Sequence, residues 1–197
     1  MADIFPTWIE KLSAGEQSLT IGLLVLAALL TLSFLFRTPL QHWRETRRIT
    51  RAVKRMGARF RRNVTLPDGM GAETRIDYLV LSADALLVIG VKRYDGMIFG
   101  SAQTDEWTQI LNSRSYKFPN PDTYLAEQVT AVRCLVPKIP VRGLHLFSDS
   151  ASFPWDKPPN VLQSRDLRNS GAPRPALKDI PEELRKAWLH VLQSVKR

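Results

Sequence analysis

The most prominent feature of the hydrophobic pattern is an uninterrupted apolar run near the amino terminus. Residues 19–36 read LTIGLLVLAALLTLSFLF and contain no charged side chain. A helix rises about 1.5 Å per residue, so this run is about 27 Å long, close to the roughly 30 Å hydrocarbon core of a bilayer. The pattern therefore predicts one transmembrane helix over residues 19–36, preceded by a short extracytoplasmic tail over residues 1–18.

A cleaved signal peptide is the alternative interpretation of the same run. Signal peptides begin with a basic stretch and end at small residues. Here residues 1–18 carry a net charge of −2, and Arg37-Thr38-Pro39 follows the apolar run. The sequence therefore favours a helix that remains in the mature protein.

Beyond residue 36 the pattern changes to segments with helical and strand periods. Ile49, Ala52, Val53 and Met56 recur at helical spacing, which predicts a basic amphipathic helix over residues 41–56. Short apolar stretches bounded by turn residues predict strands. The predicted strands cover residues 61–66, 74–82, 85–92, 96–100 and 142–148; further helices are predicted over 122–135 and 181–195, and a surface loop over 149–174.

The mixture of strands and helices defines an α/β fold class. Residues 63–197 form one domain in this interpretation, because the 161 residues after residue 36 are enough for one hydrophobic core. Residues 37–62 form a separate basic helix and linker. The predicted organisation is thus a tail, a span, a basic segment and one domain that ends with a loop and a helix.

Charge is concentrated directly after the apolar run. Residues 37–62 hold ten basic side chains and one acid, Glu45, whereas residues 63–197 hold 17 basic and 15 acidic side chains. Basic residues beside a span favour its cytoplasmic end. The charge pattern therefore predicts a single-pass protein of the inner membrane, with the amino terminus outside and the domain in the cytoplasm.

The basic segment has two interpretations. Beside a span it contacts anionic lipid headgroups, with about 1 kcal/mol contributed by each basic residue near the surface. Alternatively it is a phosphate-binding helix that leads into a site for DNA. Its position favours the headgroups, for which the expected contacts are Arg44, Arg47, Arg48, Arg51, Lys54 and Arg55.

Candidate chemistry lies on two neighbouring predicted strands. Asp77 stands in an apolar strand, where a buried carboxylate without a partner is costly, so a metal-binding or hydrogen-bonding role is favoured. Gly90 and Lys92 are two positions apart and face the same side of the next strand. Asp77 is therefore a candidate site residue, whereas Lys92, taken alone, would most often be a strand-end charge in water.

The three histidines offer no obvious metal site. His42, His145 and His190 lie far apart in the sequence, and Cys134 is the single cysteine. Structural zinc sites bring His and Cys ligands together at short, regular spacings. Neither a zinc site nor a cysteine nucleophile is therefore predicted.

Many positions along the domain agree in order and spacing with one known family. They are Asn63-Val64-x-Leu66-Pro67, Ile76-Asp77, Val88-Ile89-x-Val91-Lys92, Tyr94-x-Gly96-x-Ile98-x-Gly100, Trp107 and Phe118-x-Asn120-Pro121. In these positions the chain resembles the nuclease-related domain family, abbreviated NERD, over about residues 40–150. The resemblance implies a restriction-endonuclease-like core, with a mixed sheet flanked by helices, and a role in DNA processing. It also implies that Asp77 and Lys92 are catalytic residues, with Asp77 as the metal ligand, because Mg²⁺ prefers carboxylate and phosphate oxygens and a nearby ammonium stabilises developing charge.

The chain departs from the family pattern at the implied metal site. The glutamate of the family's Glu-x-Lys motif falls on Gly90, and a further family glutamate, in the helix before the first strand, falls on Glu45. The family's Gln-Asn pair falls on Tyr124 and Leu125, and its following histidine on Gln128. With Asp77 as the remaining carboxylate, the resemblance predicts weak binding of Mg²⁺.

Three functions are compatible with these features. The favoured one is a catalytically degenerate domain that binds nucleic acid or a protein partner at the cytoplasmic face of the membrane. The second is an active metal-dependent nuclease, in which Glu45 or Glu73 completes the site with Asp77 and Lys92. Glu73 shares the strand face of Asp77 but lies about 13 Å along the chain, which makes it a poor substitute. The third is a membrane-tethered scaffold that binds no nucleic acid.

Overall fold

The computed structural model describes residues 14–69, 71–169 and 173–196, and within its first helix it leaves the side chains of 14–18, 20 and 33–42 undescribed. Contacts divide the chain into two compact units, Met1–Thr46 and Arg47–Arg197. Helix α1 (Ala14–Met56) contains the helix predicted over 41–56 and begins well before it. The second unit includes the last turns of α1 and all of the strands.

In the first unit, α1 exposes the apolar side chains that the structure describes between residues 19 and 32. Among the described residues, however, no helix combines the length and apolar character that crossing a membrane requires. The transmembrane helix predicted over residues 19–36 is therefore not supported. Most of the predicted tail, residues 1–13, lies outside the described residues.

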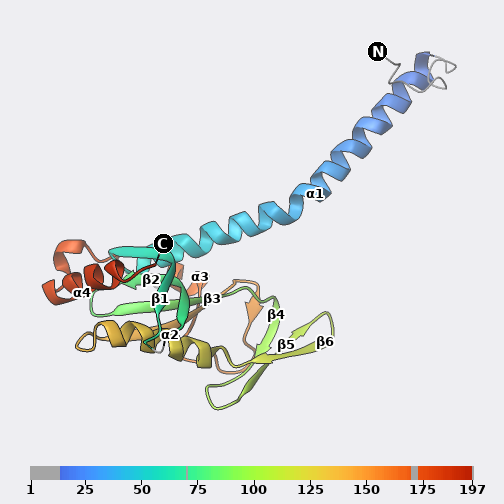
Figure 1. The fold of residues 1–197 in the computed structure, drawn as a ribbon. Coiled ribbons are helices and arrows are strands. Elements are labelled where there is room, and N and C mark those ends of the chain that lie inside the picture. Colours follow the sequence, from blue (N-terminus) through green and yellow to red (C-terminus); the bar gives the residue numbers. More distant parts are fainter. Residues whose placement is uncertain (1–13, 70, 170–172, 197) are drawn as a thin grey trace. The chain divides into compact units, whose positions relative to one another are not determined.

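The second unit is built on a five-stranded sheet (Figure 1). Because β1, β2 and β3 are consecutive antiparallel strands and β7 and β9 continue the sheet in parallel, the sheet is mixed, as predicted. A tight turn joins β2 to β3, in which the Ser82 amide donates to the Ala85 carbonyl over 3.0 Å. The strands are, in spatial order, β1 (Arg59–Pro67), β2 (Glu73–Leu81), β3 (Leu86–Lys92), β7 (Val141–Phe147) and β9 (Val161–Gln163).

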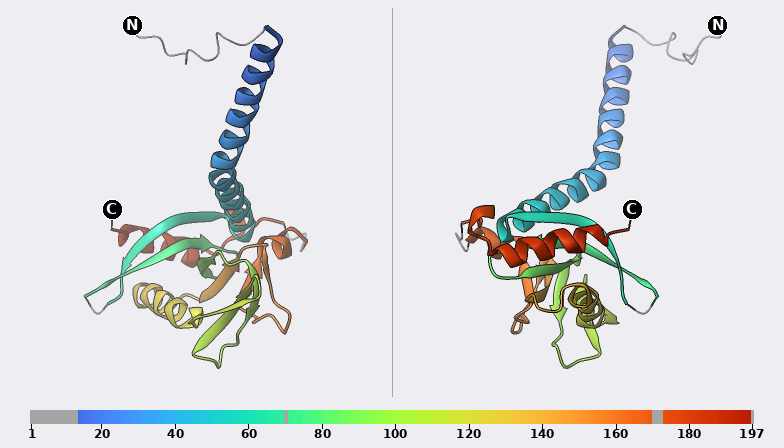
Figure 2. Two further views of the ribbon diagram at one scale, coloured as in Figure 1. Left: turned by 90° about the vertical axis from the view of Figure 1, so that its right-hand side faces the viewer. Right: turned by 60° about the vertical axis from the view of Figure 1, so that its left-hand side comes forward.

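Successive residues of a strand point to opposite sides of the sheet, so both faces carry apolar side chains. Helices cover both faces. Helices α2 (Pro121–Leu135) and α4 (Glu182–Gln193) share a core with one face, which includes Leu79 and Val88 (Figure 1 and Figure 2). On the other face, Val53 of α1 packs with Val80 and Ile89. The predicted α/β class, a mixed sheet flanked by helices, is confirmed.

A second, smaller sheet has the strand order β6, β5, β4, β8. Its core contains the fully buried Trp107, which stacks on Phe147 of the first sheet with ring centroids 6.0 Å apart. Gly96 begins β4 with a φ of +80°, and a β-carbon there would lie 2.3 Å from the Ile110 carbonyl oxygen. The strands are β4 (Gly96–Phe99), β5 (Glu106–Leu111), β6 (Arg114–Pro119) and β8 (Ala151–Ser152).

Several elements lie where no regular structure is predicted. The hairpin of β5 and β6 is absent from the predicted strands, and β6 is almost entirely exposed, so it lacks the apolar alternation that predicts a strand. The predicted loop over 149–174 contains two short strands and helix α3 (Ser164–Asn169). A 3₁₀ turn, η2 (Leu177–Asp179), precedes α4. Strands β8 and β9, helix α3 and the turn η2 are too short for a periodic signal.

Candidate functional site

One face of the central sheet changes from apolar to polar along its strands. Leu79 on β2 and Val88 on β3 are buried in the core beneath α2. Two positions further along each strand, on the same face, stand Asp77 and Gly90, and Lys92 follows Gly90. The polar end of this face borders a cavity of about 210 Å³, which we call the strand-end cavity; its lining residues are Arg75, Asp77, Gly90, Lys92, Pro121, Tyr124, Leu125, Gln128 and His145.

Asp77 is half-buried and hydrogen-bonded to the backbone. Its Oδ2 accepts from the Val91 amide over 2.7 Å. The paired residues of β2 and β3 end at Tyr78 and Ile89, so the carboxylate satisfies an amide just beyond the ladder. Its other oxygen has no hydrogen-bond partner among the described residues, so it is available to bind water or a ligand. Asp77 therefore has a structural hydrogen bond and one oxygen left for binding.

Lys92 is half-buried, and its side chain lines the same cavity. Its carbonyl accepts from the Ser148 amide over 2.9 Å, which fixes the end of β3. Among the described residues its ammonium forms no ion pair. A phosphate group in the cavity would therefore meet the positive charge of Lys92.

Neither of the additional glutamates is among the residues that line the strand-end cavity. Glu45 belongs to the first compact unit, which ends at Thr46. Glu73 forms an ion pair with Lys196 over 2.5 Å and does not line the cavity. Among the described residues, no group of three or more His, Cys, Asp and Glu side chains is placed to hold a metal ion. The cavity therefore offers one carboxylate, Asp77, which fits poorly with an oxygen-liganded Mg²⁺.

The structure adds His145 to this site. It is 1% exposed, and it pairs directly with Gly90 across β3 and β7. Its Nε2 lies 2.8 Å from Asp122 Oδ1, which also accepts from Asn160 Nδ2 over 2.6 Å. Because a carboxylate only accepts, Nε2 carries a hydrogen, and in the neutral imidazole Nδ1 keeps its lone pair. Nδ1 is buried and has no hydrogen-bond partner among the described residues.

The environment of His145 favours the neutral imidazole. Burial lowers the pKa of His145 below its ordinary value of 6.5, and the charge of Lys92 lowers it further. The hydrogen bond and charge of Asp122 act in the opposite direction without overcoming burial. Nδ1 is consequently an acceptor at neutral pH.

His145 is absent from the sites predicted from sequence because histidine spacing cannot show which strands are neighbours. It is nevertheless the one ionisable side chain within the apolar core of its strand, in the run Leu144-His145-Leu146-Phe147. A buried ionisable residue requires a partner or a function. That local pattern is the signal that identifies it.

The Asn120-Pro121 pair explains how Asp122 reaches His145. Asn120 Oδ1 accepts from the Asp122 amide over 2.9 Å and so caps the first turn of α2. Its Nδ2 donates to the carbonyls of Thr104, over 2.7 Å, and Ser101, over 3.3 Å. The helix start is thereby tied to the loop before β5. This attachment holds the Asp122 carboxylate over β7.

Helix α2 is also bound to β2 beside the cavity. Tyr124 Oη and Gln128 Nε2 both donate to the Arg75 carbonyl, over 3.3 Å and 2.5 Å. Together with Leu125, which is buried, these are three of the positions at which the resemblance predicts a departure from the family pattern. Here they hold the helix against the strand and leave a cavity of modest size.

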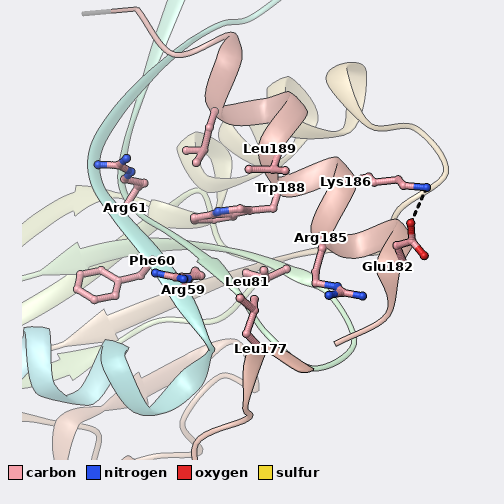
Figure 3. A pocket seen from close by; sticks show the side chains of 11 residues that line it. Arg59, Phe60, Arg61, Leu81, Leu177, Glu182, Arg185, Lys186, Trp188 and Leu189 are labelled. Atoms are coloured by element: carbon pink, nitrogen blue, oxygen red, sulfur yellow. Dashed lines mark ion pairs between the residues drawn. The ribbon is translucent and has the colours of Figure 1, made fainter. Parts of the chain in front are cut away.

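A larger cavity of about 610 Å³ lies between β1 and α4 and has a different character. Figure 3 shows Trp188 of α4 directed toward β1, with Arg59 and Arg61 on the strand side. Its single acid, Glu182, pairs with Lys186 over 2.8 Å. This cavity is apolar and basic and holds neither a second carboxylate nor a histidine. The chemistry therefore points to the strand-end cavity as the candidate site.

Comparison with known proteins agrees with the resemblance in the sequence. The family model for the nuclease-related domain (NERD) matches residues 41–148, more than half of the 197 residues. The chain therefore belongs to the nuclease-related domain family. An uncharacterised protein of Bacillus anthracis is 28% identical over 111 residues, which cover 54% of this chain and 52% of that relative. The chain thus spans about half the length of the curated relative it matches. No solved structure gives a significant match.

Proposed function

We propose that this chain is a nuclease-related domain that binds nucleic acid at the strand-end cavity and whose Mg²⁺-dependent hydrolysis is weak or lost. The carrying observation is the presence of one carboxylate, Asp77, in a cavity where the family resemblance expects two. Mg²⁺ is usually held through carboxylates and phosphate oxygens, and Gly90 supplies no side-chain ligand. Family membership favours divalent-metal chemistry and DNA as the substrate class.

Charge on the second unit supports binding to a polyanion. Residues 47–197 hold 25 basic and 15 acidic side chains, for a net charge of +10. On α1, Arg48, Arg51 and Arg55 line a pocket of about 130 Å³ with Ser164 and Arg168; we call it the arginine pocket. Basic side chains gathered at one place contact phosphates and displace counterions from nucleic acid. The arginine pocket is therefore the proposed contact for the backbone phosphates.

Location at the inner membrane, with the amino terminus outside and the domain in the cytoplasm, is part of the same proposal. It is supported by the apolar run over 19–36, the basic residues that follow it, and the exposed apolar side chains of α1. A reporter fused after Arg197 should report a cytoplasmic location. Reporter activity outside the cytoplasm would reverse this orientation, and release of the chain by a salt wash would contradict insertion into the bilayer.

The decisive test of function measures binding and cleavage separately with the full chain. Plasmid and single-stranded DNA are incubated with the protein and Mg²⁺ or a chelator, and binding is followed over a range of salt concentrations. We expect salt-dependent binding and little Mg²⁺-dependent cleavage. Robust cleavage that Asp77→Ala abolishes would show an active nuclease. Absence of DNA binding at low salt would overturn the proposal in favour of a protein scaffold.

A further inference from the structure

The cavity of about 610 Å³ between β1 and α4, which we call the α4 groove, has the size of a small-molecule site. Such sites measure roughly 300–1,000 Å³. None of the residues that line the α4 groove also lines the strand-end cavity. A ligand bound in the groove is therefore independent of the candidate nuclease chemistry.

The groove exists because β1, an edge strand of the five-stranded sheet, carries arginines on the face that α4 covers. Arg59 pairs with Leu81, and Arg61 pairs with Leu79. Paired residues of antiparallel strands stand on the same face, and both leucines belong to the core that includes α4. Because arginine is almost never fully buried without a partner, α4 does not close over this part of β1. A space therefore remains between the helix and the edge of the sheet.

Helix α4 contributes a mostly apolar wall to the groove. The lining positions that recur at helical spacing on this side of the helix are Arg185, Trp188, Leu189 and Leu192. Trp188 is buried, whereas Leu189 is 60% exposed and Leu177, from η2, is 37% exposed (Figure 3). Two exposed leucines in the groove leave apolar surface in contact with water, and a hydrocarbon chain would cover that surface favourably. The groove is therefore suited to an alkyl chain.

Three arginine side chains give the groove a positive charge. Its single acid, Glu182, is paired with Lys186 over 2.8 Å. Within the part of the chain that the structure describes, Arg59, Arg61 and Arg185 form no ion pair. Nε of Arg185 is buried and has no hydrogen-bond partner there either. A buried donor without an acceptor is unfavourable, and a guanidinium group binds phosphate or carboxylate oxygens through paired hydrogen bonds. An anionic group at these arginines is therefore stabilised.

We propose that the α4 groove binds a single-chain anionic amphiphile, which is an alkyl or acyl chain that ends in a phosphate or a carboxylate. Its headgroup contacts Arg59, Arg61 and Arg185, and its chain lies against Leu177 and Leu189. Both parts of this ligand match the groove, because guanidinium groups bind the anion and leucine surface binds hydrocarbon. The amphiphile is taken up as a free molecule, so the groove is a binding site in addition to the proposed nucleic-acid function.

A nucleobase fits the groove less well than a hydrocarbon chain. Single-stranded nucleic acid binds by stacking its bases on exposed aromatic faces. Trp188 is only 6% exposed. Phe60 pairs with Val80, which packs on the α1 face of the sheet, so the Phe60 ring is directed away from α4. The accessible apolar surface of the groove is therefore aliphatic, which favours an alkyl chain over a stacked base.

Calorimetric titration of the full chain with alkyl phosphates, below the micelle concentration of each ligand, tests the groove. Each methylene removed from water contributes about fourfold in affinity. We therefore expect dodecyl phosphate to bind on the order of a hundredfold more tightly than hexyl phosphate, and inorganic phosphate to bind most weakly. Dodecyl glucoside, which has no charge, should bind roughly tenfold more weakly than dodecyl phosphate.

Two variants act on different parts of the ligand and leave the buried core in place. Arg59→Gln/Arg61→Gln removes two exposed charges and should weaken dodecyl phosphate binding roughly tenfold, with little effect on dodecyl glucoside. Leu189→Gln removes exposed apolar surface and should reduce the difference in affinity between dodecyl and hexyl phosphate. The control for charge is Arg114→Gln/Lys138→Gln, which removes two exposed cations outside the groove and should leave dodecyl phosphate binding unchanged.

The apolar side chains of α1 need a control of their own, because they are also exposed. Leu23→Gln/Leu30→Gln replaces two of them and should leave the affinity for dodecyl phosphate unchanged. A photoreactive dodecyl phosphate should label peptides from β1, η2 or α4. Weaker binding in this variant, with the label on α1, would place the amphiphile on that helix and overturn the inference.

Three further outcomes would also overturn it. Equal affinities for dodecyl phosphate and inorganic phosphate would show that the arginines attract any anion. Unchanged dodecyl phosphate binding in both groove variants would place the ligand elsewhere. If Arg59→Gln/Arg61→Gln loses affinity for DNA or for phosphatidylglycerol vesicles but not for dodecyl phosphate, these arginines contact a polyanionic surface instead of a free amphiphile. Because the inference does not rest on the proposed function, dodecyl phosphate binding in the groove of a chain that binds no DNA would reject the proposed function alone.

Discussion

Gly90 of β3 and His145 of β7 are direct partners in the parallel part of the sheet, and a β-carbon on Gly90 would lie 3.5 Å from His145 Nδ1. That distance is an ordinary van der Waals contact, so packing does not demand glycine at this position. A side chain at position 90 would therefore change the chemistry of the cavity without a clash of its β-carbon.

Gly90→Glu should consequently be tolerated and should strengthen Mg²⁺ binding. The new carboxylate would stand on the face of β3 that bears Lys92, beside Asp77, which gives the cation a second oxygen ligand. We expect at least a tenfold gain in Mg²⁺ affinity by calorimetry. Gly90→Gln, of equal size and without charge, should show no such gain. Equal Mg²⁺ affinity of the two variants would contradict the expectation.

Cleavage by Gly90→Glu is a stricter measurement than binding. Tyr124 and Gln128 hold α2 against β2 beside the cavity, so access of a DNA phosphate is limited on that side. A gain in Mg²⁺ affinity without cleavage would place the remaining defect in these helix residues. A gain in both would show that the missing carboxylate was the main obstacle.

Protonation of His145 should couple the stability of the apo-protein to pH. Burial lowers its pKa in the folded chain below the ordinary value of 6.5, so the unfolded chain binds the proton more readily. The contribution to stability is full above about pH 6.5 and is lost as the pH falls from there through the folded pKa. With a chelator present, the thermal midpoint should decrease more between pH 7.5 and 5.5 in the wild type than in His145→Gln. The exposed His190→Gln control should retain the wild-type slope, and identical slopes in all three proteins would reject the coupling.

Asn120 should be important for the stability of the whole second unit. It is 7% exposed, caps α2 and donates to two loop carbonyls. Asn120→Ala removes all three hydrogen bonds and should lower the free energy of unfolding by on the order of 2 kcal/mol in urea. Asn120→Asp keeps the capping oxygen and loses the donor, so its loss should be smaller. Equal losses in the two variants would show that the cap itself contributes little.

The central hairpin of the site is predictable because it is local in sequence. The turn from Ser82 to Ala85 sets the register of β2 on β3, and alternation then places Asp77, Gly90 and Lys92 on one face. The apolar periods of these strands are strong, so their limits agree within one residue with those of the sequence pattern. Local periodicity was therefore sufficient for this half of the site.

The other half depends on contacts that periodicity cannot show. His145 reaches Gly90 through the parallel pairing of β3 with β7, more than fifty residues later, and Asp122 reaches His145 from the start of α2. Spacing along the chain carries no information on which strand becomes a neighbour. The β5–β6 hairpin, which lies between β3 and β7 in the sequence, is not predicted for another reason: β6 buries almost none of its side chains.

The arginine pocket should contribute the main electrostatic part of DNA binding. Arg48, Arg51 and Arg55 share one side of α1 and are exposed, so their substitution by Gln leaves the core residues Ala52 and Val53 in place. Each lost phosphate contact should lower the slope of log K against log salt by about 0.9. The triple variant should therefore bind DNA much more weakly at low salt and with a shallower salt dependence. Binding is measured by fluorescence anisotropy with the full chain.

The matched control removes the same charge elsewhere on the second unit. Arg114, Lys138 and Lys178 are exposed and lie on β6, the loop after α2 and η2, and their substitution by Gln should change the slope far less. Vesicles with anionic lipid form the second arm of the experiment. Loss of DNA binding with retained vesicle binding would assign the pocket to nucleic acid, whereas loss of vesicle binding alone would assign it to lipid headgroups. Equal effects of the two triple variants on DNA would mean that net charge, rather than this pocket, attracts the polyanion.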